Sequence, residues 1–248
     1  MSMLEPSEIL VTGGNGRLGR ALAALGCRTV SRDELDITDQ NAVISQIATG
    51  GTQCVINAAA YTAVDAAESD KERAEQVNSF GAGCVARAAA ARGVPCIHIS
   101  TDCVFGDADP AAPVVEIAKV NPLSVYGLTK WRGEQAVLQA GGKACIVRVA
   151  WLFDGGADTF IGKMLKIARG RDVLSVVDDE FGRPTPVSAL AIQVMELADL
   201  LAFDLAPVPE ILHLGPEIPV SRYEWAAQIF GASARSGGPA PRLERVSA

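Results

Sequence analysis

The sequence predicts an α/β protein with a doubly wound parallel sheet and a small, shortened C-terminal lobe. Short apolar runs alternate with helical segments along the first two thirds of the 248 residues. Parallel neighbouring strands need crossover connections, so this alternation places helices on both faces of the sheet. After Trp151 the character of the chain changes. We therefore expect a nucleotide-binding sheet domain over residues 1–150, and a reduced substrate-binding region interleaved with the end of the sheet over residues 151–248.

Each expected strand is a short apolar run, which is typical of a strand buried on both faces. In the sheet domain these strands cover residues 8–12, 28–31, 53–58, 95–100 and 144–150. Alanine-rich segments favour helices, here over residues 17–25, 39–47, 71–92 and 124–140. The C-terminal region is predicted to hold strands at 173–177 and 211–214 and helices at 159–169, 186–201 and 222–230. The tail from Gly231 is rich in Gly, Ser, Pro and Arg and is expected to fray.

Composition excludes several classes of protein. A net charge of −7 argues against a nucleic-acid or anionic-membrane partner, because both need a basic surface. Neither a membrane-spanning apolar run nor a basic signal segment is evident. The six cysteines show no Cys-x-x-Cys spacing and only two histidines occur, so we expect reduced thiols, no metal site and a cytoplasmic location. Whether the protein is a monomer or a homodimer stays open.

A glycine-rich segment follows the first strand and opens the first helix. Residues 12–19 read Thr-Gly-Gly-Asn-Gly-Arg-Leu-Gly, with Gly13, Gly16 and Gly19 three residues apart. The first glycine turns the strand into the loop, the second lets backbone approach a pyrophosphate, and the third packs the helix on the sheet. Free N–H groups at the helix start favour phosphate. The segment therefore predicts a dinucleotide site of the Rossmann type.

The end of the second strand bears on cofactor choice. An acidic side chain at this position favours NAD, because it accepts a hydrogen bond from the ribose 2′-hydroxyl and repels a 2′-phosphate. This chain has Ser31 and Arg32 instead, and a guanidinium suits a phosphate. We expect NADP(H) to be preferred, with NAD(H) as the alternative.

Tyr126 and Lys130 are spaced i to i+4 in the segment Val-Tyr-Gly-Leu-Thr-Lys, so both lie on one face of a helix. An ammonium near a phenol favours phenolate and is expected to lower the Tyr pKa, which suits Tyr126 to exchange a proton. Thr101 and Asp102 stand at the end of the fourth strand, at the edge where open α/β sheets bind ligands. The Thr101 hydroxyl can hold a substrate carbonyl there while Tyr126 protonates it.

Together these segments resemble the extended short-chain dehydrogenase/reductases, and among them the dTDP-4-dehydrorhamnose reductase family. The resemblance runs from about residue 8 to residue 226. It rests on Leu-Asp-Ile-Thr-Asp (35–39), Asn-Ala-Ala-Ala-Tyr-Thr-Ala-Val-Asp-Ala-Ala-Glu (57–68), Ser-Thr-Asp-Cys-Val-Phe-Gly (100–106), Pro-Leu-Ser-Val-Tyr-Gly-Leu-Thr-Lys (122–130), Arg-Val-Ala-Trp (148–151) and Phe-Gly-Arg-Pro-Thr (181–185). It implies NADPH-dependent reduction of a nucleotide-linked 4-keto-6-deoxysugar.

The resemblance also implies residue roles. Tyr126 is the expected proton donor, Lys130 binds the nicotinamide ribose and tunes Tyr126, and Thr101 holds the keto oxygen. Asp102 and Trp151 are expected beside the sugar, and Asn78 in a proton relay or a structural role. The implied cofactor contacts are Gly13, Asn15, Gly16, Arg17, Leu18, Gly19, Ser31, Arg32, Asp36, Ile37, Ala58, Ala59, Ala60, Thr62 and Lys130.

Three departures from the family pattern keep other functions open. Cys103 stands where the family usually has Tyr, Asn15 replaces a glutamate associated with a metal-bridged dimer, and the chain ends earlier than the family does. The first alternative is a non-catalytic NADP-binding regulatory subunit, similar to the β-subunit of methionine adenosyltransferase. The second is a sugar-nucleotide epimerase or dehydratase that uses Tyr126 and Lys130 with tightly held NAD.

Overall fold

The computed structural model describes residues 3–106, 113–208 and 210–248, which form two compact units. Among them, the first unit comprises residues up to 106, 114–149 and 188–214. The second comprises residue 113, 150–187 and 215–248. The chain thus leaves the first unit after Val149, returns at Ser188 and leaves again after Leu214.

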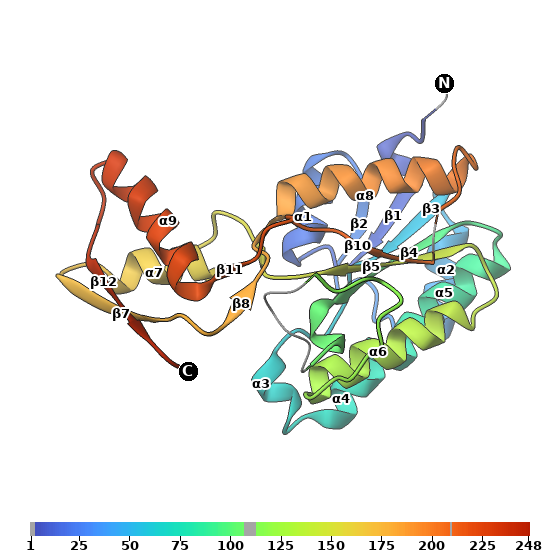
Figure 1. The fold of residues 1–248 in the computed structure, drawn as a ribbon. Coiled ribbons are helices and arrows are strands. Elements are labelled where there is room, and N and C mark those ends of the chain that lie inside the picture. Colours follow the sequence, from blue (N-terminus) through green and yellow to red (C-terminus); the bar gives the residue numbers. More distant parts are fainter. Residues whose placement is uncertain (1–2, 107–112, 209) are drawn as a thin grey trace. The chain divides into compact units, whose positions relative to one another are not determined.

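A parallel sheet forms the centre of the first unit (Figure 1). Its strand order is β10-β5-β4-β3-β1-β2, and every neighbouring pair is parallel. The strands are β1 (Ile9–Thr12), β2 (Arg28–Val30), β3 (Cys54–Asn57), β4 (Cys96–Thr101), β5 (Ala144–Val149) and β10 (Ile211–His213). The connections from β1 and β3 run in opposite directions, so the topological switch point lies between these strands, where such sheets bind ligands. The predicted α/β class is confirmed.

Helices cover both faces of this sheet, as Figure 1 shows. On one face lie α1 (Arg17–Ala24) and α8 (Val187–Ala202), and on the other α2 (Gln40–Ala48), α5 (Ala82–Ala91) and α6 (Val125–Leu138). Their starts follow from the sequence, since Asp39 and Ser124 accept backbone N–H hydrogen bonds in the first turns of α2 and α6. No helix in the described part of the chain is long and apolar enough to cross a bilayer.

The helix expected over residues 71–92 is interrupted. It consists of α4 (Lys71–Glu75), a π-helical turn η2 (Gln76–Gly81) and α5, and a short helix α3 (Val64–Ala67) precedes it. The widened turn places the Asn78 carbonyl against α6, where a side chain on Gly133 would approach that oxygen to 2.0 Å. Single π-helical turns inside α-helices are frequent at functional sites, and this one carries Asn78.

The second unit has its own core. Within it, α7 (Phe160–Ile167) and α9 (Arg222–Arg235) lie beside β7 (Val173–Val177), which pairs in parallel with β12 (Arg242–Val246). Short pairs join β6 (Leu152–Phe153) to β9 (Thr185–Pro186) and β8 (Phe181–Gly182) to β11 (Val220–Ser221). The expectation of a fraying tail is wrong: α9 continues to Arg235, and Leu243 of β12 packs on the core of this unit.

Candidate active site

The end of β4 presents a hydroxyl at the carboxyl edge of the sheet. Thr101 is the last residue of β4 and caps the short helix η3 (Asp102–Val104), where its Oγ1 accepts from the Cys103 N–H at 3.2 Å. The same Oγ1 lies 3.1 Å from Asp102 Oδ1. These contacts fix Thr101 in one orientation, with the Asp102 carboxylate and the Cys103 thiol beside it.

The start of α6 brings Tyr126 to this hydroxyl. Tyr126 lies in the first turn of α6, and its side chain comes near the Thr101 hydroxyl, which favours the phenolate form. The next residue, Gly127, makes the close approach possible, because a Cβ there would lie 2.4 Å from the Cys103 carbonyl oxygen. The two elements that the sequence predicted to converge therefore do so in the structure.

The electrostatics of Tyr126 differ from the expectation. Burial raises the pKa of the phenol above its ordinary value, and the neighbouring Cys103 and Asp102 raise it further, while the nearby Thr101 hydroxyl opposes them. The predicted lowering by Lys130 is wrong for this protein without ligand, because desolvation dominates and the ammonium bonds to other groups. Tyr126 is consequently a neutral phenol at physiological pH, able to donate a proton.

Lys130 is fully buried one turn further along α6. Its Nζ donates to the Ile99 carbonyl at 2.6 Å and lies 3.4 Å from His98 Nε2. Burial lowers its pKa to about 8, and the carboxylate of Glu134 counteracts part of this effect. Lys130 therefore carries its proton below about pH 8 and loses it above.

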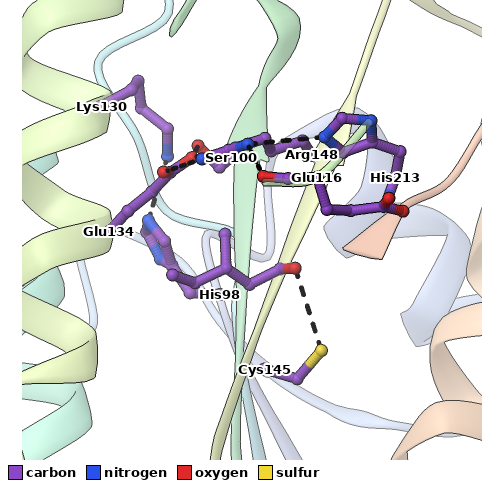
Figure 2. Close-up of polar contacts among 9 residues, drawn as sticks. His98, Ser100, Glu116, Lys130, Glu134, Cys145, Arg148 and His213 are labelled. Carbon is purple, nitrogen blue, oxygen red and sulfur yellow. Dashed lines mark hydrogen bonds and ion pairs between the residues drawn. The ribbon is translucent and has the colours of Figure 1, made fainter. Parts of the chain in front are cut away.

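A second buried ionic group stands next to Lys130. Figure 2 shows Glu134 projecting from α6 toward Arg148 of β5 and Ser100 of β4. Arg148 holds the carboxylate of Glu134 with two bonds of 2.9 and 2.7 Å, and Ser100 donates to it at 2.5 Å. Such a bidentate pair offsets part of the cost of burying both charges, and removal of either partner would leave an uncompensated charge. It ties α6 to the strands that carry the candidate catalytic groups.

The glycine-rich loop is packed as the sequence predicts. Gly13 has φ +78°, and a Cβ on it would lie 2.7 Å from the Ala59 nitrogen, so only glycine fits. A Cβ on Gly19 would lie 2.3 Å from the Gly13 carbonyl oxygen. Gly16 stands at the N-cap of α1 and has no side chain to cap the first turn, and the uncapped start of a helix is a favourable position for a phosphate. Gly13 and Ala59, both predicted cofactor contacts, therefore lie together.

Other predicted cofactor residues border this loop. The Gly14 N–H bonds to the Val30 carbonyl at 2.8 Å, which places the loop beside Ser31. The Ser31 N–H donates to Glu34 Oε2 at 2.7 Å, so one carboxylate stands close to the expected 2′-phosphate position. Asn15, Gly16, Arg32 and Thr62 are exposed, Arg17, Ala58, Ala59 and Ala60 are half-buried, and Leu18 and Gly19 are buried.

Asp36 and Ile37 are occupied within the fold. The Asp36 carboxylate accepts from Thr38 at 3.0 and 2.7 Å and pairs with Arg73 at 3.3 Å. Ile37 is buried in the core, where a Cβ on Gly81 would meet its side chain at 2.8 Å. Their contact with adenine stays a prediction. Because Ile37 is buried and the Asp36 carboxylate is engaged, that contact would involve the exposed edge of Asp36 and backbone atoms.

Asn78 links the loop after β3 to α6. Its amide accepts from the Tyr61 N–H at 2.8 Å and donates to the Tyr61 carbonyl at 3.1 Å and to Thr129 Oγ1 at 3.1 Å. Thr129 in turn donates to the Tyr126 carbonyl at 3.0 Å. The buried side chain thus has a structural role: it holds the segment of Ala58 to Thr62 against the helix that carries Tyr126.

Trp151 belongs to the second unit, where it sits in an aromatic cluster. Its φ of 44° is unusual for a bulky residue. The ring stacks on Trp225, with centroids 5.6 Å apart, and the Arg222 guanidinium lies 3.5 Å above it. A Cβ on Gly182 would lie 2.1 Å from the ring. Backbone strain of this kind is concentrated at functional sites. The expected contact of Trp151 with the sugar remains a prediction.

Sequence reasoning missed three buried groups beside the site: His98, Asn57 and Glu134. His98 is 0% exposed, although it stands in the otherwise apolar run Cys-Ile-His-Ile of β4. A polar residue in the interior of a strand buried on both faces needs a partner. That anomaly could have identified His98 as a site residue.

The chain is similar in sequence and in structure to known proteins. The family model described as RmlD substrate binding domain matches residues 7–247. A dTDP-4-dehydrorhamnose reductase of Mycolicibacterium smegmatis is 40% identical over 91% of this chain and 69% of its own length. One from Sinorhizobium fredii is 35% identical over 97% and 83%. Among solved structures, the dTDP-4-dehydrorhamnose reductase of Bacillus anthracis in complex with NADP has a TM-score of 0.86 and 30% identity, covering 97% of this chain and 84% of that one.

The fold of this chain also recurs at lower identity. A dTDP-glucose 4,6-dehydratase from Streptomyces venezuelae, solved with NAD and TYD, has a TM-score of 0.75 at 18% identity and shares the fold. The resemblance inferred from the sequence motifs is confirmed by the higher-identity relatives. The chain belongs to the RmlD substrate-binding domain family and is similar over most of its length to dTDP-4-dehydrorhamnose reductases.

Proposed function

We propose that this protein is an NADPH-dependent reductase of a nucleotide-diphospho-4-keto-6-deoxysugar, with dTDP-4-dehydrorhamnose as the expected substrate. The observation that carries the proposal is the convergence of Thr101 at the end of β4 with Tyr126 and Lys130 of α6 at the carboxyl edge of the sheet, where Gly127 packs on Cys103 and Lys130 bonds to the Ile99 carbonyl. At about 4.8 Å per strand, Thr101 stands two strands, or about 10 Å, from the glycine-rich loop. The matched relatives bear the corresponding enzyme name.

The residues of the loop fit the proposed cofactor. The loop is exposed at Asn15 and Gly16, and the start of α1, which has no side-chain cap, would offer its N–H groups to a pyrophosphate. Ser31 and Arg32 would meet a 2′-phosphate, and the related Bacillus anthracis structure was solved with NADP. Bound NADPH would supply a hydride to the substrate carbonyl carbon.

The side chains would orient the carbonyl and supply its proton. Thr101 would donate a hydrogen bond to the keto oxygen, and Tyr126 would transfer its phenolic proton to that oxygen as negative charge develops there. Burial keeps Tyr126 protonated, as this direction of reaction requires. Lys130 would contact the nicotinamide ribose, and its ammonium would stabilise the phenolate left after transfer.

Two further residues are proposed as substrate contacts. Asp102 is exposed next to Thr101 and would accept a hydrogen bond from a sugar hydroxyl. Trp151 would pack on the sugar ring. A cytoplasmic location is part of the proposal and is consistent with five buried cysteines and one half-buried cysteine, all free.

An assay of NADPH oxidation with a set of nucleotide-linked sugars tests this function. We expect turnover with 4-keto-6-deoxysugars linked to dTDP, and none with the corresponding 4-hydroxy sugars, which lack the acceptor carbonyl. Binding of NADPH without turnover on any 4-ketosugar would overturn the proposal and favour a regulatory subunit. Conversion of a sugar nucleotide without added NADPH, with NAD co-purifying, would indicate an epimerase or dehydratase instead.

A further inference from the structure

A row of buried polar side chains crosses the sheet from the glycine-rich loop to Lys130. Thr12 pairs with Asn57 across β1 and β3, and Asn57 pairs with His98 across β3 and β4. Register partners in a parallel sheet point to the same face, so the three side chains are neighbours. None is more than 1% exposed.

The contacts along this row are continuous. Thr12 Oγ1 donates to Asn57 Oδ1 at 2.7 Å, and Asn57 Nδ2 lies 3.1 Å from His98 Nδ1. His98 Nε2 lies 3.4 Å from Lys130 Nζ. In Figure 2 the His98 ring and the Lys130 amine face each other between α6 and the sheet. The row therefore ends on the ammonium that the proposed reaction uses.

Donor counting restricts the states of this row. A neutral imidazole has one donor and one acceptor nitrogen, and burial together with the charge of Lys130 lowers the pKa of His98 well below its ordinary value. If the Lys130 ammonium donates to Nε2, then Nδ1 carries the proton and needs the Asn57 oxygen. If the Asn57 N–H₂ donates to Nδ1, then Nε2–H donates to an uncharged Lys130 amine.

The proton of Lys130 is thereby coupled to the orientation of Asn57 and Thr12. We propose that His98 is a positioning residue, which holds Lys130 in place and couples its protonation to the strand end that begins the cofactor loop. The inference rests on the proposed function, because it assigns His98 a part in setting the charge of Lys130. Thr12, Asn57, His98 and Lys130 all lie within the first unit.

Other charged groups around Lys130 do not replace His98. Glu134 lies on the same helix but is held by Arg148 of β5 and Ser100 of β4. The other titratable groups on the elements packed against α6 are Asp65 of α3, Lys71, Glu72, Arg73 and Glu75 of α4, Cys84 and Arg87 of α5, Cys96 of β4, Asp102 and Cys103 of η3, and Cys145 of β5. Glu75 pairs with Arg132, Arg87 bonds to Cys84, and Glu68, which follows α3, accepts from the Val125 N–H. His98 is thus the described titratable side chain that contacts the Lys130 amine directly.

Three substitutions separate the two nitrogens of His98. His98→Gln keeps a polar group near Nε2, His98→Asn keeps one near Nδ1, and His98→Leu keeps neither. Ile97→Val is the matched control, because it alters packing in the same buried strand without touching the row. The titration of Lys130 is followed by NMR of lysine-labelled protein without cofactor or substrate, with circular dichroism to verify folding.

We expect the midpoint of Lys130 to fall by about one pH unit in His98→Leu and His98→Asn, a tenfold change, since a hydrogen bond to a charged group is lost. Both His98→Gln and Ile97→Val should titrate within about 0.3 units of the wild type. Equal midpoints for Gln, Asn and wild type would show that His98 only fills space, even if His98→Leu does not fold. The titration does not depend on turnover. A wild-type protein without reductase activity would therefore overturn the proposed function, while the role of His98 would still be decided by the titration.

Discussion

Burial decides the acid–base properties of the two central side chains. Tyr126 and Lys130 lie one helical turn apart, yet desolvation shifts both toward their neutral forms, raising the pKa of the phenol and lowering that of the ammonium to about 8. The sequence predicted their proximity from spacing. It predicted the wrong direction for the shift of the Tyr126 pKa, because the depth of burial depends on how η3, β4 and α6 pack.

The shift at Lys130 makes stability depend on pH. Since the folded protein releases this proton near pH 8 and an unfolded lysine near 10.5, the unfolded state binds more protons between these values, and the unfolding free energy rises with pH across that window. Relative to Lys130→Met, the wild type should gain up to about 3 kcal/mol from pH 8 to 10.5.

Urea denaturation at several pH values measures the unfolding free energy of both proteins. Subtracting one value from the other removes the contribution of the titratable groups that both proteins contain. A difference that stays constant between pH 8 and 10.5 would show that Lys130 titrates as an exposed lysine does.

Among the elements, α6 depends on two glycines. Gly127 lets its first turn approach η3, and Gly133 lets its centre approach the π-turn at Asn78. Helix propensity and apolar spacing predicted α6 and the ends of most other elements. They could not predict the π-turn, which arises from contact between α6 and η2, nor β12, whose Arg-Leu-Glu-Arg-Val segment is mostly exposed and is ordered by pairing with β7.

Replacement of Gly133 by Ala should destabilise the first unit. The added methyl would lie 2.0 Å from the Asn78 carbonyl oxygen, and overpacking of this kind costs about 1–3 kcal/mol. Gly155→Ala is the control, since a Cβ there meets nothing within 4 Å and should change stability by less than about 0.5 kcal/mol. Chemical denaturation gives both values, and equal stabilities of the two variants would mean that α6 does not need this close contact.

The two units are proposed to have separate tasks. The first unit contains the glycine-rich loop, Thr101, Tyr126 and Lys130, so cofactor binding should reside there. The second contains Trp151, held by Trp225, Arg222 and Gly182. Sequence motifs identified most residues of the first unit's site, but the strained backbone of Trp151 has no signature in the sequence.

Removal of residues 242–248 tests this division. Since β7 pairs with β12 in a two-stranded sheet, the truncated protein should show fast amide exchange over Val173–Val177 and lose turnover. Its affinity for NADPH should change by less than about threefold, because the glycine-rich loop and Lys130 belong to the first unit. Hydrogen exchange with mass spectrometry and a fluorescence titration of NADPH measure these effects; unchanged exchange in β7 would refute the role given to β12.

The variant Tyr126→Phe tests whether Tyr126 donates the proton to the substrate carbonyl. Steady-state turnover and NADPH affinity are compared with those of Tyr223→Phe, a second-unit tyrosine whose ring contacts Arg245. We predict that Tyr126→Phe binds NADPH as the wild type does and loses turnover by about 10²–10⁴-fold, while Tyr223→Phe keeps its turnover. A Tyr126→Phe protein with more than about a tenth of wild-type turnover would contradict the account.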